Sequence, residues 1–303
     1  MRRTWAAVTA GVFAVVATAQ PTMRVNSDLV LVPVSVMDRA DRPVRGLTAD
    51  RFRVFERGLE QTVAHLSVEE QPVSVAIVFD VSGSMGAKLR YSREALEAFW
   101  RVSNPEDDFS VIEVSGRPQV LASFTRDTDA LQSQLMFTAS AGRTALIDGI
   151  YMAAREARKG RWARRAVLVI SDGRDNYSRY NVPELQTALA ESGVAVYTIG
   201  LYGDMDELAA GLDGNGPAGP ALLQSLAAET GGRHYRVAKD SELPDVAAAI
   251  GAELREQYVL SYAPKNHERD GRYRHVRVTV KSDAGARWKV FARPGYWARD
   301  GAW

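Results

Sequence analysis

The stretch Val73-Ser-Val-Ala-Ile-Val-Phe79, followed by Asp80-Val-Ser-Gly-Ser84, decides the fold that we predict for this chain. Apart from Ser74, the first seven residues are apolar, and a short unbroken apolar run is typical of a strand buried on both faces. The turn after it places one carboxylate and two hydroxyls at alternate positions, just before a helical pattern begins. We therefore expect a buried strand that carries a polar loop at its carboxyl end.

Apolar strands continue to alternate with helical segments further along the chain. We expect strands at 109–114, 120–124, 166–170, 194–201 and 233–237, and helices at 90–102, 144–159, 183–192, 221–230 and 243–255. Such alternation favours a mostly parallel sheet with helices on both faces, joined by right-handed crossovers. The predicted fold class is α/β, with a doubly wound, Rossmann-like sheet over residues 72–256.

Strand patterns without helices flank this region on both sides. Residues 24–71 hold three β-type runs, and residues 257–298 hold three more. Because three strands alone bury one face poorly, we expect the two flanking segments to pair into one small β-sandwich, with the α/β domain inserted between them. Two separate caps are the alternative, but they would leave exposed sheet edges.

Residues 1–19 have the three parts of a secretory signal: Met1-Arg2-Arg3, an apolar run, and Ala17-Thr-Ala19 before Gln20. A membrane anchor is the alternative, but the run from Thr4 to Val16 is shorter than the roughly 20 residues that a span needs. We therefore expect cleavage near Ala19 and a secreted, periplasmic or cell-envelope protein. No membrane span is expected in the mature chain.

The composition excludes several classes of function. The 303 residues are 46% hydrophobic and 25% charged, as in ordinary globular proteins. Cleavage near Ala19 removes two arginines and no acid, so the formal charge changes from +1 to −1 and gives no overall attraction to nucleic acid. The absence of cysteine excludes disulfides, thiolate metal sites and thiol nucleophiles. The sequence leaves the oligomeric state open.

Two more oxygen-bearing side chains occupy places equivalent to the polar loop. Thr144 begins a helical segment, and Asp172 directly follows an apolar strand. Loops at the carboxyl ends of neighbouring parallel strands meet at one edge of the sheet. The residues expected to converge there are Asp80, Ser82, Ser84, Thr144 and Asp172. Such hard oxygen donors suit Mg²⁺ or Mn²⁺, with Ca²⁺ less favoured, and do not suit zinc or copper.

In order and spacing, Asp80-Val-Ser-Gly-Ser84, Thr144 and Asp172-Gly173 resemble the metal-ion-dependent adhesion site (MIDAS) of von Willebrand factor A (VWA) domains. The resemblance covers about residues 72–256. It implies that Ser82, Ser84 and Thr144 contact the metal directly, and that Asp80 and Asp172 act as outer ligands.

The flanking segments resemble a narrower group of exported bacterial proteins, the acidobacterial-type VWA-related family. The resemblance rests on residues 28–36, 42–47, 52–56, 257–262 and 293–296. Because that group has no well-defined biochemical role, the resemblance supports the expected domain arrangement but says little about the function.

A divalent ion whose aspartates lie in its outer shell keeps a position for an incoming carboxylate. We therefore expect a non-enzymatic adhesion or protein-binding module, in which a partner's Asp or Glu completes the metal shell. A structural subunit of an envelope complex is the first alternative. A metal-dependent hydrolase is the second, but it would need a general base or a second metal, which the motif does not supply.

Several neighbouring residues are expected at the rim of the site: Gly83, Gly173, Asp175, Asn176 and Tyr177. A polar turn would explain Asp175 and Asn176 equally well.

Asp148 lies one helical turn beyond Thr144, where it could orient the threonine loop or simply favour the helix N-terminus, and we prefer the second interpretation. Helix capping would explain Ser82, Ser84 or Thr144 singly, but not all five site residues together.

Overall fold

The computed structural model describes residues 29–67, 71–202, 219–283 and 286–298. The predicted secretory signal at residues 1–19 lies outside these ranges. Within them, no helix has both the length and the apolar character that crossing a membrane requires.

A six-stranded sheet forms the larger unit, with strand order β10-β9-β8-β5-β6-β7. Its strands are β5 (Ser74–Asp80), β6 (Asp108–Val114), β7 (Gln119–Thr125), β8 (Arg165–Ser171), β9 (Ala195–Leu201) and β10 (His234–Val237). All pairs are parallel except β6 with β7, since the four residues that join these two strands are too few for a crossover. The predicted α/β class with a mostly parallel sheet is confirmed.

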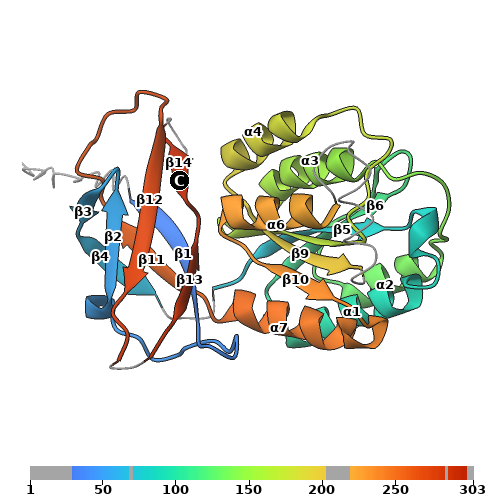
Figure 1. The fold of residues 1–303 in the computed structure, drawn as a ribbon, viewed down its shortest axis with the longest axis horizontal. Coiled ribbons are helices and arrows are strands. Elements are labelled where there is room, and N and C mark those ends of the chain that lie inside the picture. Colours follow the sequence, from blue (N-terminus) through green and yellow to red (C-terminus); the bar gives the residue numbers. More distant parts are fainter. Residues whose placement is uncertain (1–28, 68–70, 203–218, 284–285, 299–303) are drawn as a thin grey trace, which may run out of the picture.

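Helices cover both faces of this sheet (Figure 1). One face carries α1 (Leu89–Val102), α2 (Thr128–Met136) and α7 (Leu243–Arg255). The other carries α3 (Leu146–Glu156), α4 (Val182–Ser192) and α6 (Gly219–Thr230). Helix α2 was not predicted from the sequence, although Asp127 precedes it as an N-cap: the Asp127 side chain accepts the Ala130 N–H at 2.9 Å. Short 3₁₀ turns occur at Ala49–Arg51, Gly83–Met85, Ala157–Lys159 and Asp240–Glu242.

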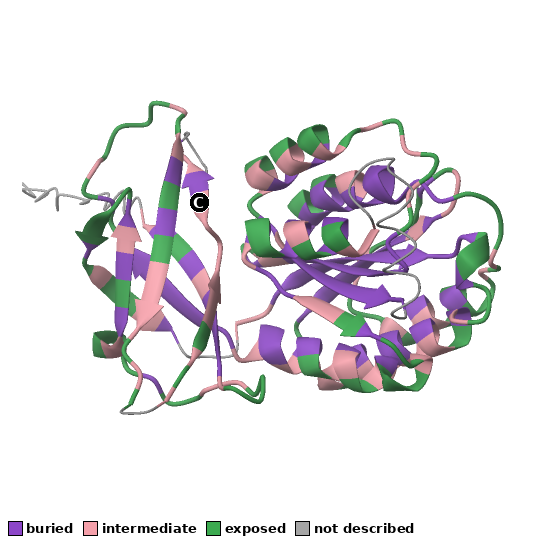
Figure 2. Cartoon of the chain, viewed as in Figure 1, coloured by how far each residue is buried: buried purple, intermediate pink, exposed green. Residues whose placement is uncertain are grey.

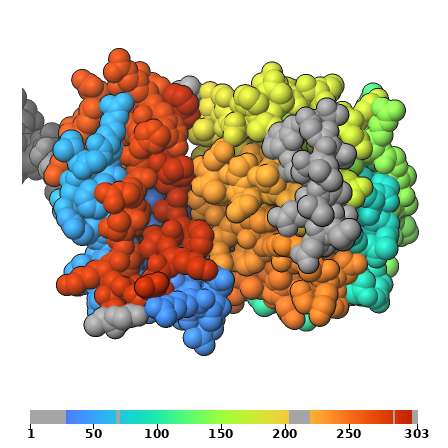
Figure 3. Space-filling view, in the orientation of Figure 1, coloured from blue at the N-terminus to red at the C-terminus, as the bar shows by residue number. Residues whose placement is uncertain are grey.

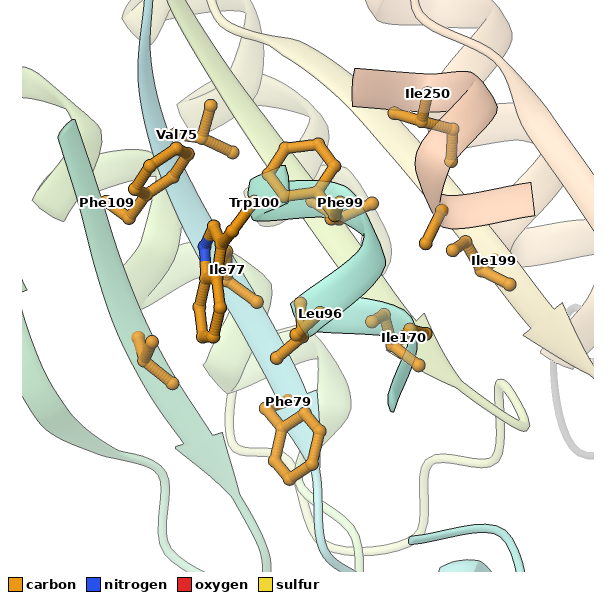
Figure 4. Packing of buried hydrophobic residues seen from close by; sticks show 14 of the residues in the cluster. Val75, Ile77, Phe79, Leu96, Phe99, Trp100, Phe109, Ile170, Ile199 and Ile250 are labelled. Atoms are coloured by element: carbon orange, nitrogen blue, oxygen red, sulfur yellow. The ribbon is translucent and has the colours of Figure 1, made fainter. Parts of the chain in front are cut away.

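Strand β5 lies at the centre of the core because side chains on both of its faces are buried. Ile77 and Phe79 pack on the side of α1, where Leu96 and Phe99 meet them (Figure 4). The alternate residues, such as Val78, pack on the side of α3. Figure 2 shows the central strands buried along most of their length. The apolar run in the sequence therefore becomes the middle of a three-layer domain.

Two four-stranded antiparallel sheets form the smaller unit, with orders β13-β1-β11-β4 and β14-β12-β2-β3. The strands from the amino-terminal segment are β1 (Val30–Met37), β2 (Phe52–Glu56), β3 (Leu59–Gln61) and β4 (Val63–Ser67). Those from the carboxyl-terminal segment are β11 (Tyr258–Tyr262), β12 (Tyr273–Val280), β13 (Lys289–Ala292) and β14 (Gly295–Trp297). Because β1 pairs with β11 and β2 with β12, each sheet mixes both ends of the chain. The expected sandwich is confirmed, and the alternative of two separate caps is wrong.

A buried polar network links the two ends of the chain inside the sandwich. Glu56, at the end of β2, accepts hydrogen bonds from Tyr262 at 2.9 Å and Tyr296 at 2.8 Å. Its other carboxylate oxygen lies 3.3 Å from Arg274 Nη1, and both members of this ion pair are buried. Glu56 therefore holds one amino-terminal strand to three carboxyl-terminal ones.

We predict that Glu56→Ala lowers the free energy of unfolding by about 3–5 kcal/mol, because it removes the buried anion of Arg274 and leaves only the partly exposed Asp270, 3.7 Å away. Glu60→Ala is the matched control: Glu60 also pairs with an arginine, Arg53, but that pair is exposed and should contribute less than about 1 kcal/mol. Urea unfolding followed by tryptophan fluorescence measures both losses. Equal losses in the two variants would contradict a structural role for the buried network.

Candidate metal centre

Three loops meet at the carboxyl edge of the central sheet. The first follows β5, the second precedes α3, and the third follows β8. Strands β5 and β8 are parallel neighbours, with Phe79 opposite Ile170, so Asp80 and Ser171 end at the same level. The Ser171 hydroxyl donates to Asp80 Oδ2 at 2.6 Å. Sheet pairing thus places the polar ends of both strands side by side.

Asp80 is fully buried at this junction. Its Oδ1 accepts the Ser82 N–H at 2.8 Å, which folds the first loop back over the strand end. Burial raises the pKa of Asp80, and the neighbouring charge of Asp172 adds to this rise, against the hydrogen bonds from Ser171 and Ser82. Two carboxylates in mutual repulsion at a buried edge would be stabilised by a cation between them.

The two serines of the first loop lie together: their Oγ atoms are 3.2 Å apart. Ser82 is buried and Ser84 is exposed. Backbone bonds fasten this loop to the second one, from Gly83 N–H to Gly142 O at 3.2 Å and from Ala141 N–H to Val81 O at 2.9 Å. A Cβ at Gly83 would lie only 3.3 Å from Gly142 O, so glycine permits this close approach.

The second loop carries Thr144, which is buried. The third loop holds it through three hydrogen bonds: Asn176 Oδ1 accepts the Thr144 N–H at 3.0 Å, and Thr144 O accepts the N–H groups of Asn176 at 2.9 Å and Tyr177 at 3.0 Å. Within the described part of the chain, no residue forms a hydrogen bond with the Thr144 hydroxyl. That oxygen is thus available to a ligand.

Asp172 shows the clearest sign of a missing partner. Its Oδ1 accepts the Arg174 N–H at 3.1 Å, but its Oδ2 is buried and has no hydrogen bond. Arg174 Nε, on a largely exposed side chain, lies 3.7 Å from this oxygen. Leaving a buried acceptor unsatisfied costs about 1–3 kcal/mol, and more for a charged group. A buried carboxylate oxygen of this kind fits a hard divalent cation.

The donors do not form a cluster of histidines and acids: in the described ranges, no group of three or more His, Asp or Glu residues is placed to hold a metal ion. The predicted ligand set instead consists of two carboxylates and three hydroxyls. Asp80 is the last residue of β5, and the other four residues of the set lie on the three cross-linked loops.

The expected rim residues have different surroundings. Gly83, Asn176 and Tyr177 are exposed at the surface, and Arg143 stacks over the Tyr177 ring at 4.8 Å. Asp175 points into the loops, where its Oδ1 accepts the Ile147 N–H at 3.1 Å and the Ser178 hydroxyl at 2.5 Å.

Gly173 is buried rather than exposed at the rim. Its φ is +80°, and a Cβ there would lie 2.7 Å from the backbone of Gly219. Glycine is therefore required so that the third loop can pass beneath the start of α6.

Residues 75–174 match the sequence model of the von Willebrand factor type A domain. The chain contains a VWA domain. The matched segment begins in β5, ends two residues after Asp172 and includes all five residues of the candidate site. Among curated proteins, none matches the chain significantly.

Solved structures of similar fold include a von Willebrand factor type A protein from Catenulispora acidiphila, with 14% identity, a TM-score of 0.52, and coverage of 91% of this chain and 74% of that one. Proximal thread matrix protein 1 from the mussel byssus has 15% identity and a TM-score of 0.50, over 72% of this chain and 51% of that one. BatB from Bacteroides thetaiotaomicron has 20% identity and a TM-score of 0.47, over 60% of this chain and 98% of that one. At these identities the likeness concerns the fold alone.

Asp148 has a larger role in the VWA domain than a favourable charge at the start of α3. Its Oδ1 accepts the N–H groups of Arg179 at 2.9 Å and Tyr180 at 3.0 Å, and its Oδ2 lies 3.2 Å from Arg179 Nε. The preferred interpretation in the sequence analysis was therefore incomplete. Asp148 orients the third loop, which in turn holds the loop of Thr144.

We predict that Asp148→Ala lowers the free energy of unfolding by about 1–3 kcal/mol, because it removes the acceptor of two backbone N–H groups. Asp129→Ala is the matched control, since Asp129 also lies in the first turn of a helix, α2, but is exposed. A charge at a helix N-terminus contributes only about 0.3–1 kcal/mol. Chemical denaturation of both variants checks this, and equal losses would show that Asp148 acts through the helix dipole alone.

Proposed function

We propose that this VWA domain is an exported, non-enzymatic protein-binding module that holds one divalent cation, Mg²⁺ or Mn²⁺, and binds a partner through an acidic side chain. The observation that carries the proposal is the buried Oδ2 of Asp172, which has no hydrogen bond and lies close enough to Asp80 for the two charges to interact. An oxygen-only donor set with two carboxylates suits these metals better than Ca²⁺, which takes more oxygen ligands at longer distances.

In this proposal Ser82, Ser84 and Thr144 contact the metal, and Asp80 and Asp172 act from the outer shell. When bound, the cation supplies an electrophilic position for a carboxylate oxygen from outside the chain. The chain's own part is to hold these donors rigidly. Ser171 fixes Asp80, the Gly83–Gly142 bond joins the first two loops, and Asn176 joins the second to the third.

The exposed residues around the centre suit a protein partner. Tyr177 is 51% exposed, and tyrosine is enriched at protein interfaces. The guanidinium of Arg143 over its ring adds a positive charge at the rim, which complements an acidic side chain. Ser84 is also exposed at the surface.

The acidic residues around the candidate site do not support a catalytic function. Asp148 and Asp175 are the further acids on them, and each accepts hydrogen bonds from backbone N–H groups. Neither is therefore placed as a general base for a metal-bound water, which a hydrolase would require. The signal pattern at residues 1–19 supports export.

We expect a tagged chain to retain a protein from envelope or secreted fractions in Mg²⁺ and to release it in EDTA. Ser84→Ala should reduce this retention at least tenfold, because Ser84 is an exposed donor of the site. Ser133→Ala, at an exposed serine on α2, is the matched control and should retain as much as the wild type. Quantitative mass spectrometry of the eluates measures all four conditions.

Retention that survives both EDTA and Ser84→Ala would contradict the metal-dependent mechanism. A structural subunit of an envelope complex would then be the better interpretation.

A further inference from the structure

A cavity of about 90 Å³ lies between the sandwich and the VWA domain, beside the amino ends of β8 and β9. It is therefore at the opposite edge of the sheet from the candidate metal centre. Both units contribute to its walls: β1 and β11 on one side, and the starts of β8 and β9 with the end of α6 on the other. Three arginines line it, Arg164, Arg165 and Arg293, and no acidic residue does.

Arg293 comes from the sandwich, between β13 and β14. Its Nε is buried and donates to no acceptor, and its guanidinium lies over the ring of Tyr296 at 5.7 Å. In the described ranges its side chain has neither a hydrogen bond nor an ion pair. Its Nη1 lies 3.7 Å from the Cβ position of Gly193, which also lines the cavity. Burial lowers the pKa of Arg293, because no carboxylate offsets the desolvation of its charge.

The two arginines from the VWA domain also lack carboxylate partners within ion-pair distance in the described part of the chain. Arg164 donates to Leu254 O at 2.7 Å and Gln257 Oε1 at 2.9 Å, as well as to Gln71 O. Arg165 Nε donates to Trp162 O at 3.1 Å. All these acceptors are neutral, and Asp107, which lies beyond ion-pair distance, offsets the charge of Arg164 only in part.

Other cations between the two units are balanced. Arg233 pairs with Glu253 at 2.8 Å and with Asp41 at 3.2 Å, and Lys289 pairs with the same Asp41 at 2.9 Å. Arg45 of the sandwich pairs with Glu256 through a bidentate contact. The cavity thus differs from these neighbouring contacts, in which each cation has a carboxylate partner.

We propose that this cavity binds a small oxyanion, held by the guanidinium groups of Arg293 and Arg165. Guanidinium groups bind carboxylate and phosphate oxygens through paired N–H donors, and the buried charge of Arg293 would gain its missing counter-ion. The volume has room for at least three water molecules at about 30 Å³ each, which is enough for an ion the size of phosphate or acetate.

The bound anion would join the two units. Arg293 belongs to the sandwich, whereas Arg165 belongs to the VWA domain, so an ion held by both favours the docked arrangement. A ligand that binds only the folded chain raises its unfolding temperature as the ligand concentration rises. Figure 3 shows the two units in contact.

The test is calorimetric titration of the purified protein with phosphate, sulfate and acetate, against chloride at constant ionic strength, with thermal unfolding under the same conditions. We expect one site per chain and a saturable rise in unfolding temperature with at least one of the oxyanions. Comparing the tetrahedral ions with acetate shows whether the site takes a phosphate-like ion or a carboxylate.

Arg293→Gln should weaken binding at least tenfold, and Arg165→Gln should weaken it several-fold. Arg158→Gln, at an exposed arginine that does not line the cavity, is the control and should bind like the wild type. A wild type that responds to no oxyanion more than to chloride would overturn the proposal. Unchanged affinity in Arg293→Gln would overturn it too; if that variant does not fold, unchanged affinity in Arg165→Gln decides against the site.

Discussion

The parallel pairing of β5 with β8 is the constraint on which the candidate site depends. It places Asp80 beside Ser171, and their 2.6 Å hydrogen bond joins the ends of two adjacent strands. Asp172 follows directly, so two carboxylates come together at one buried edge. That arrangement raises the free energy of both charges unless a cation compensates them. The loops that carry the hydroxyls are then held around this pair by backbone hydrogen bonds.

The insertion of the VWA domain into the sandwich leaves this edge of the sheet accessible. The chain enters the domain at β5 and leaves it after α7, and both connections lie on the side of the sandwich (Figure 1). The sandwich therefore docks at the amino ends of the strands, whereas the candidate metal centre lies at their carboxyl ends. Inside the sandwich, Glu56 bonds strand β2 to three carboxyl-terminal strands, so the amino- and carboxyl-terminal segments form a single unit that holds the VWA domain.

The sequence alone predicted those features that depend on the local pattern of apolar and polar residues. The apolar run before Asp80 marked the central strand, and the flanking β patterns led to the inserted sandwich. Asp80, Ser82, Ser84, Thr144 and Asp172 could be proposed because each follows a strand or precedes a helix. Short strands such as β14, and the helix α2, have too few apolar positions to form a clear period.

The contacts between loops could not be predicted in the same way. Ser171 looked like an ordinary strand residue, and only the register of β8 against β5 shows that it binds Asp80. The bonds from Asp148 to residues 179 and 180 span about thirty positions, so the pattern of one helix could not reveal them. The burial of Gly173 likewise depends on Gly219, a distant residue at the start of α6.

The central claim is that Asp172 belongs to a divalent-cation site, and calorimetric titration with Mg²⁺ and Mn²⁺ tests it most directly. Asp172→Asn replaces the unbonded carboxylate oxygen without a change of size, and Asp129→Asn is an exposed control on α2. We predict one saturable site in the wild type and the control, and at least tenfold weaker binding in the Asp172→Asn protein. Identical heats from all three proteins would contradict the claim.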